Sequence, residues 1–247
     1  MKLMWTAVAV TLALAQALQG TAAADADIRR EAVQFARGSS SAVVKGQLQG
    51  DATVDYTVRA AAGQTLTVAI QKTNPQNYFN VMPPGSTGEA MFVGHTGEDY
   101  SGLLPTDGEY VVRVYLMRPA ARRGESSNYS LAIGVTGKPL ARIAASQDAL
   151  VPGTPYHASA SIRCVPPFET TSRDCDAFVI RRAGGAATVD IPGNAVKRSI
   201  LFENGRPVAS NAQAMDALSS ERQGDTTIVK LGAQERYEIP DALITGG

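Results

Sequence analysis

The chain has 247 residues, and its 23 basic and 23 acidic side chains give a formal net charge of zero. This balance argues against a general nucleic-acid-binding protein, which would carry an excess of basic residues. Apolar residues make up 44% of the chain, so it can bury a hydrophobic core. With only 2 His and 2 Cys residues, we expect neither a metal centre nor a cofactor.

The N-terminal residues follow the pattern of an export signal. Lys2 precedes an apolar run from Met4 to Leu18, and the small residues Ala22–Ala24 follow it. The run is shorter than the roughly 20 residues that span a bilayer. We therefore predict a signal peptide, residues 1–24, cleaved after Ala24 or alternatively after Ala26; an uncleaved membrane anchor is the competing interpretation. We therefore expect the mature protein to be periplasmic or secreted and to have no later membrane span. Disulfides persist in such compartments.

Residues 25–137 show short alternating segments between turn signals, with no helical period between them. This pattern predicts an all-β fold that begins with an antiparallel β-sandwich of about eight strands. The alternation also implies that one face of each strand points to a core and the other to water. The clearest predicted strands are Ala42–Gln49, Val54–Val58, Thr65–Ile70, Tyr78–Met82, Met91–Val93, Glu109–Leu116 and Tyr129–Val135.

A second, smaller β-rich domain is predicted for residues 138–247. Pro139 supports the boundary, because proline removes a backbone donor and restricts φ. Asn204–Gly205 between two apolar runs predicts a hairpin, and the spacing within Asn211–Arg222 predicts one short helix. The other predicted strands are Tyr156–Arg163, Ala177–Arg182, Ala187–Ile191, Lys197–Phe202 and Thr226–Leu231.

Cys164 and Cys175 are the two cysteines of the chain. In an exported protein a single pair predicts a disulfide. A redox-active pair is the alternative, but the chain lacks the C-x-x-C spacing that favours one.

Enzyme signatures are absent from the sequence. It contains no G-x-S-x-G, H-E-x-x-H, G-x-x-x-x-G-K-[ST] or G-x-G-x-x-G motif. His95 lies in a predicted turn and His157 follows Pro155–Tyr156 at the start of a predicted strand. A hydrolase that uses one of these histidines as a base is an alternative, but we expect no enzymatic activity.

Basic side chains gather after one predicted strand. That strand contains Arg113, and the following loop carries Arg118, Arg122 and Arg123 around Pro119. We predict that they lie at a hairpin tip, where guanidinium groups suit an acidic cleft on another protein. The alternative is a solvated loop that keeps a sheet edge soluble.

The residues also resemble a known family over about residues 33–135. The stretches that carry the resemblance are Phe35–Ala42, Gly46 with Gly50, Asp55–Thr57, Ala62–Leu66, Gly108–Val114 and Asn128–Leu131. They are similar to the periplasmic inhibitors of g-type lysozyme, and also to the broader class of pre-peptidase C-terminal β-sandwich domains. Residues 139–247 show no such resemblance.

The resemblance implies a β-sandwich that blocks the substrate cleft of a g-type lysozyme, which would be the protein partner. By position, Arg118 and Arg122 match the loop arginines associated with inhibition, and we add Arg123 as a target-binding residue. A non-catalytic cell-envelope binding module of the pre-peptidase C-terminal type is the alternative function.

Overall fold

The computed structural model describes residues 28–86, 88–97, 99–193 and 196–246. The predicted signal peptide and both of its predicted cleavage sites lie outside these residues. Strands dominate the described chain, which confirms the predicted all-β class. None of its helices is long and apolar enough to cross a membrane.

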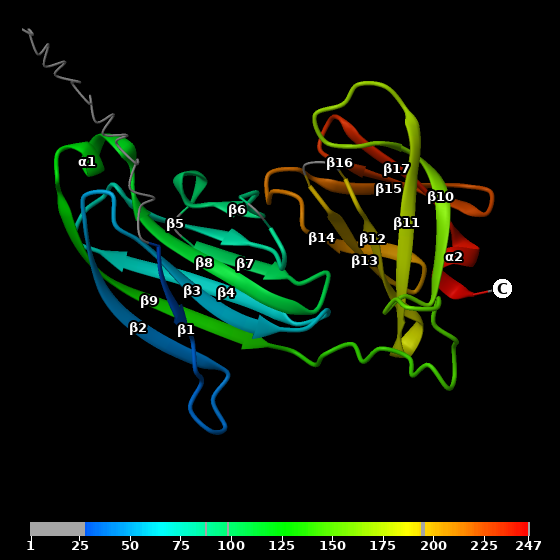
Figure 1. Ribbon diagram of the computed structural model, residues 1–247, viewed down its shortest axis with the longest axis horizontal. Coiled ribbons are helices and arrows are strands. Elements are labelled where there is room, and N and C mark those ends of the chain that lie inside the picture. The colour runs from blue at the N-terminus through cyan, green and yellow to red at the C-terminus, as the bar shows by residue number, and fades with distance from the viewer. Residues whose placement is uncertain (1–27, 87, 98, 194–195, 247) are drawn as a thin grey trace, which may run out of the picture.

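Two sheets form the N-terminal sandwich, β1–β9, which lies at one end of the molecule in Figure 1. All neighbouring strands pair antiparallel except β1 and β3, which run parallel. The first sheet has the order β1 (Ile28–Ala32), β3 (Thr53–Ala60), β8 (Gly108–Leu116), β5 (Asn77–Met82) and β6 (Phe92–Val93). The second has the order β2 (Ser41–Gln49), β9 (Ser126–Thr136), β4 (Thr65–Lys72) and β7 (Asp99–Leu103).

The sandwich core follows from the alternation in the sequence. Tyr110, Val112, Val114 and Leu116 are all buried along β8, while the residues between them are partly exposed. Such a period of two places one face of a strand against the core. A buried contact of 2.9 Å between the hydroxyls of Tyr56 and Tyr129 joins the two sheets.

Gly46, in β2, is one of the glycines that carry the family resemblance, and the structure shows why glycine stands there. A Cβ atom at this position would clash with the ring and hydroxyl of Tyr129. Glycine therefore leaves the space that this buried tyrosine occupies between the sheets.

The C-terminal sheet holds the remaining strands. It has the order β14 (Arg206–Ser210), β13 (Arg198–Glu203), β12 (Ala186–Ile191), β11 (Arg173–Arg182), β10 (Ala158–Val165), β17 (Glu235–Pro240), β16 (Thr226–Leu231) and β15 (Leu218–Gln223). Its two edge strands, β14 and β15, contact each other, so the sheet curls toward a barrel. The predicted hairpin at Asn204–Gly205 is confirmed as the β13–β14 connection.

The predicted helix at Asn211–Arg222 is wrong. Residues 211–217 form turns and the next residues form β15, while the short helix of this region is α2 (Asp241–Thr245). Asn211 accepts a hydrogen bond from the Ser199 amide and donates one to the carbonyl of Lys197, at 2.8 Å each. The amide of Ala214 donates to the Met91 carbonyl of the sandwich. These tertiary hydrogen bonds outweigh a weak helical preference.

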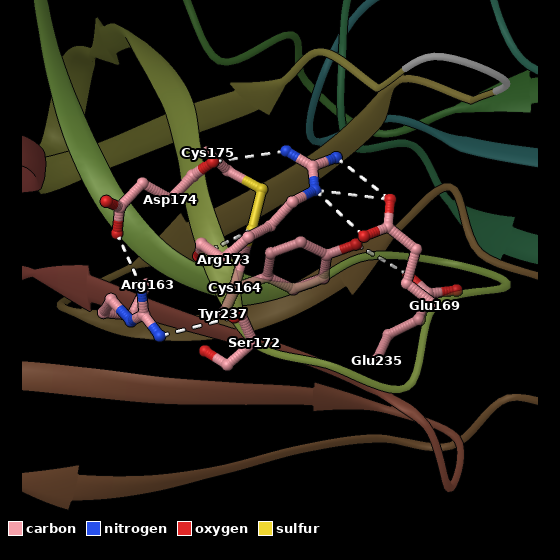
Figure 2. Close-up of a disulfide and its surroundings, with 9 residues drawn as sticks. All are labelled: Arg163, Cys164, Glu169, Ser172, Arg173, Asp174, Cys175, Glu235 and Tyr237. Carbon is pink, nitrogen blue, oxygen red and sulfur yellow. Dashed lines mark hydrogen bonds and ion pairs between the residues drawn. A yellow bond between two sulfur atoms is a disulfide. The ribbon is translucent and has the colours of Figure 1, made fainter.

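A disulfide joins Cys164 of β10 to Cys175 of β11, with a Cα–Cα distance of 6.0 Å. Figure 2 shows the bond beside the loop that it closes. Glu169 and Arg173 form an ion pair within the same loop. The structural interpretation of the two cysteines is thereby confirmed.

Replacing both cysteines by serine should lower the free energy of unfolding by about 3 kcal/mol, because the bond restricts the loop in the unfolded chain. Urea unfolding of the parent and of the Cys164→Ser/Cys175→Ser protein measures the difference. Equal midpoints and slopes would show that the bond contributes nothing. The double variant also avoids the unpaired thiol that a single substitution leaves.

Asp107 connects the sandwich to the C-terminal sheet. Its carboxylate accepts hydrogen bonds from Arg182 of β11 at 3.0 and 3.2 Å and from Arg142 at 2.8 Å. The Arg182 side chain is fully buried and also donates to Thr188 and to the carbonyl of Leu140. The Thr188 hydroxyl in turn donates to the carbonyl of Pro105. The junction between the two parts is therefore held by a hydrogen-bond network around a fully buried guanidinium.

Candidate functional site

The segment that carries the arginines is a short helix, α1 (Arg118–Arg122), between β8 and β9. These strands belong to different sheets, so the segment crosses the end of the sandwich instead of closing a hairpin. The predicted hairpin tip is therefore wrong. Figure 1 shows α1 at the end of the sandwich remote from the C-terminal sheet.

Local sequence explains the crossing. Pro119 stands at the start of α1, where the helix needs no backbone donor. Ala120 and Ala121 are buried against the sandwich core and draw the segment inward. Gly124, at φ +68°, ends the helix in the left-handed conformation that glycine adopts without strain. The predicted loop therefore forms a helical turn because its small residues are buried.

A hydrogen-bonded clamp holds the far end of α1. Glu125 accepts hydrogen bonds from Arg123 at 2.6 Å and from the side chain of Asn74 at 2.8 Å. These hydrogen bonds, that from Asn74 first, lower the pKa of Glu125 below its ordinary value. The carbonyl of Glu125 accepts from the amide of Gly50, and the amide of Met117 donates to the Gln76 carbonyl, at 2.9 Å each. Three connections of the sandwich are thus tied together around α1.

The structure separates the four arginines that the sequence placed together. Arg113 is bound to Asp55 on β3 by two hydrogen bonds of 2.7 and 2.8 Å, and Arg123 belongs to the clamp. Arg118 and Arg122 are exposed, and the side chain of neither makes a hydrogen bond or ion pair with any other residue that the structure describes. Residues four apart lie on the same face of a helix. These two guanidinium groups therefore form the cationic surface of α1.

The histidines have different surroundings. His157 is buried: its Nδ1 accepts from the amide of Arg181 at 3.0 Å, so its Nε2 carries the proton and donates to the carbonyl of Ile143. A ring with both nitrogens engaged by the backbone is a structural residue. His95 lies exposed in the turn η1 (Gly94–Thr96). No group of three or more potential metal ligands occurs among the described residues.

The fold and the site define an all-β sandwich protein that presents a rigid cationic surface, joined to a disulfide-bonded second sheet. No family model matches the sequence. No curated protein matches it either.

Solved structures that are similar to this chain include three that are each described as a periplasmic lysozyme inhibitor of g-type lysozyme. That from Aeromonas hydrophila is 41% identical and covers 44% of this chain and 97% of its own, with a TM-score of 0.42. That from Salmonella Typhimurium is 25% identical (44% and 98% covered, TM-score 0.36). A mutant of the Escherichia coli protein is 27% identical (44% and 99% covered, TM-score 0.35).

The identity of 41% over nearly the whole Aeromonas hydrophila protein shows that the chain belongs to the family of periplasmic inhibitors of g-type lysozyme. The predicted resemblance is thereby confirmed. The covered share, 44% of this chain, leaves more than half of the protein without a counterpart in that relative.

Proposed function

We propose that the protein inhibits g-type lysozyme by placing the cationic surface of α1 in the acidic substrate cleft of the enzyme. Glycosidases of this kind use carboxyl groups on either side of the scissile sugar bond. A guanidinium group pairs with a carboxylate through two parallel hydrogen bonds. Arg118 and Arg122 would pair with such groups, and occupancy alone would exclude peptidoglycan. The inhibitor itself contributes no chemical step.

The observation that carries this proposal is the contrast between a fixed backbone and two unpaired cations. The backbone of α1 is anchored by Ala120 and Ala121 in the core and by the Glu125 clamp. Arg118 and Arg122 project from it without partners among the residues that the structure describes. A binding surface that is already ordered loses little conformational entropy on association. The family membership of the chain supports the same target.

The proposal extends to export and to domain organisation. We propose that cleavage after Ala24 or Ala26 releases the mature protein into the periplasm, where the relatives are described as residing. The Cys164–Cys175 disulfide supports an oxidising compartment. We further propose that residues 25–137 form the inhibitory domain and residues 138–247 a separate β-rich domain.

A panel of lysozymes tests the proposed target. The purified mature chain is added to goose-type, hen-type and invertebrate-type enzymes, and lysis of bacterial cells is followed by turbidity. We expect inhibition of the goose-type enzyme alone. Undiminished lysis by all three would refute the proposal and favour the alternative, a non-catalytic envelope-binding module of the pre-peptidase C-terminal type.

Glu125→Ala tests the role of the clamp. It leaves Arg118 and Arg122 in place but releases Arg123 and Asn74, so we expect the inhibition constant to rise about tenfold as α1 becomes less ordered. Glu125→Gln, which keeps an acceptor for Asn74, should have a smaller effect. Inhibition kinetics measure both variants, and hydrogen exchange of the Ala121 amide, which donates to the Met117 carbonyl, should be faster in the alanine variant. Equal inhibition by all three proteins would contradict this role.

A further inference from the structure

A groove lies at the junction of the sandwich and the C-terminal sheet, remote from α1. Its volume is about 230 Å³, and it is lined on one side by Ser101, Gly102 and Leu103 of β7 and on the other by β14 and residues 212–214 and 216–218. β7 is an edge strand of the second sheet, and β14 and β15 are both edge strands of the C-terminal sheet. Three strand edges therefore meet at one groove.

The free edge of β7 presents unpaired backbone groups to this groove. The amide of Leu104 donates to the carbonyl of Gln64, and β7 continues from there antiparallel to β4. Hydrogen-bonded pairs alternate along an antiparallel ladder. The backbone groups of Ser101 and Leu103 therefore point away from β4, and no hydrogen bond to them from outside the ladder occurs within the described chain.

A second cavity of about 300 Å³ shares Gln213 and Asp216 with this groove, and Phe168 also lines it. Within this cavity Arg198 is buried and bound to Glu235 by two hydrogen bonds and to Glu89 by a third, of 2.8 Å. Asp216 makes no side-chain hydrogen bond or ion pair with any residue that the structure describes. The lining of this cavity thus carries one guanidinium and three carboxylates, which is a formal negative excess.

Two features of the cavity bear on what it could bind. Burial raises the pKa of Glu89 because it disfavours the charged form; Arg198 acts to lower this pKa, while Glu235 and Asp216 add smaller repulsions that raise it. Phe168 is 81% exposed, so an apolar ring lies free at the rim. An added positive charge would relieve the repulsion among the carboxylates, and an aromatic face attracts cations.

We propose that this groove binds an extended segment of another polypeptide that carries a basic side chain. The segment would add a strand to the free edge of β7, with its backbone paired to Ser101 and Leu103. Its lysine or arginine would reach Asp216, and a neighbouring apolar or basic side chain would contact Phe168. The proposal concerns a surface distant from α1 and does not depend on lysozyme inhibition.

Peptide titration of the mature full-length chain tests the proposal. The probe is a blocked pentapeptide of alternating valine and lysine, and its binding is followed by NMR. We expect saturable binding, with slower amide exchange at Ser101 and Leu103, because a paired strand protects these groups. Asp216→Asn should weaken binding about tenfold, since it removes a charged partner of the lysine. Asp51→Asn, at an exposed aspartate in the β2–β3 turn beside α1, should leave binding unchanged.

Two further peptides separate backbone pairing from charge alone. A version N-methylated at alternate residues keeps the lysines but removes backbone donors, and we expect it not to bind. The valine–glutamate pentapeptide should not bind either. The proposal is overturned if the lysine peptide does not bind, if the methylated or acidic peptide binds equally well, or if Asp216→Asn has no effect. Equal affinity for n-butylamine would assign the cavity to small amines and would likewise overturn strand pairing.

Discussion

The Arg118→Ala/Arg122→Ala protein should inhibit g-type lysozyme about a thousandfold less strongly than the parent, at an unchanged melting temperature. Arginine anchors at interfaces commonly contribute about 2 kcal/mol each when truncated, and two such losses correspond to this factor. Stability should be preserved because both side chains are exposed and lack partners in the described structure. Inhibition kinetics and thermal unfolding measure the two quantities on the same preparations.

A matched control removes two other exposed arginines. Arg37 and Arg59 are exposed residues of the same sandwich. β3 begins beside α1, and Arg59 lies near the other end of this strand. The Arg37→Ala/Arg59→Ala protein loses the same net charge. If inhibition depends on the position of the arginines on α1, this protein should inhibit as strongly as the parent. If both double variants lose activity equally, general charge attraction is the cause, and a fully active α1 variant would refute the proposed mechanism.

Asp107→Asn should lower the free energy of unfolding by about 3 kcal/mol, the loss expected when one partner of a buried ion pair is removed. The substitution keeps the size of the side chain but leaves the fully buried guanidinium of Arg182 without its counter-charge. Urea unfolding measures the loss. The matched double variant Asp107→Asn/Arg182→Met removes both charges and should be more stable than Asp107→Asn alone. If the single variant is as stable as the parent, the pair does not hold the junction.

The same carboxylate predicts how stability depends on pH. Burial acts to raise the pKa of Asp107, but hydrogen bonds from the Ala62 amide, Arg182 and Arg142 outweigh it and hold the pKa below its ordinary value of 3.8. The folded protein therefore binds this proton less readily than the unfolded chain does. The stabilisation is complete at neutral pH and is lost as the pH falls through the folded pKa. Between about pH 5 and about pH 3 the parent should lose more stability than Asp107→Asn. Glu89 acts in the opposite sense, but it is present in both proteins.

The strands of the sandwich were predictable because their signal is local. Along β8 the apolar residues alternate with polar ones, and each predicted strand between residues 42 and 135 is present in the structure. β1, β7, β15 and β17 escaped prediction. β1 is exposed throughout and β15 nearly so, and neither shows the required alternation. The helix assigned to Asn211–Arg222 failed because distant partners, Ser199 and Met91, bind its backbone and side chains.

The candidate site was predictable only in part. Four arginines close together in sequence indicated a cationic surface, and Arg118 with Arg122 remain candidates for it. Arg113 and Arg123 do not belong to this surface, because they form ion pairs with Asp55 and Glu125. The positions of these two acids follow from strand register and from the clamp. The groove beside β7 had no sequence signal, because Ser101 of β7 and Asp216 of the turns before β15 are far apart in the chain and only the fold brings them to one groove.

By itself, the sequence determined the all-β class, most strands, the disulfide and the resemblance to lysozyme inhibitors, since these depend on alternation, cysteine count and local motifs. Only the tertiary structure decided that α1 crosses between two sheets, which arginines are paired, and how Asp107 joins the two parts. Ion pairs and strand edges form between residues far apart in the chain, and their geometry exists only once the sheets have packed.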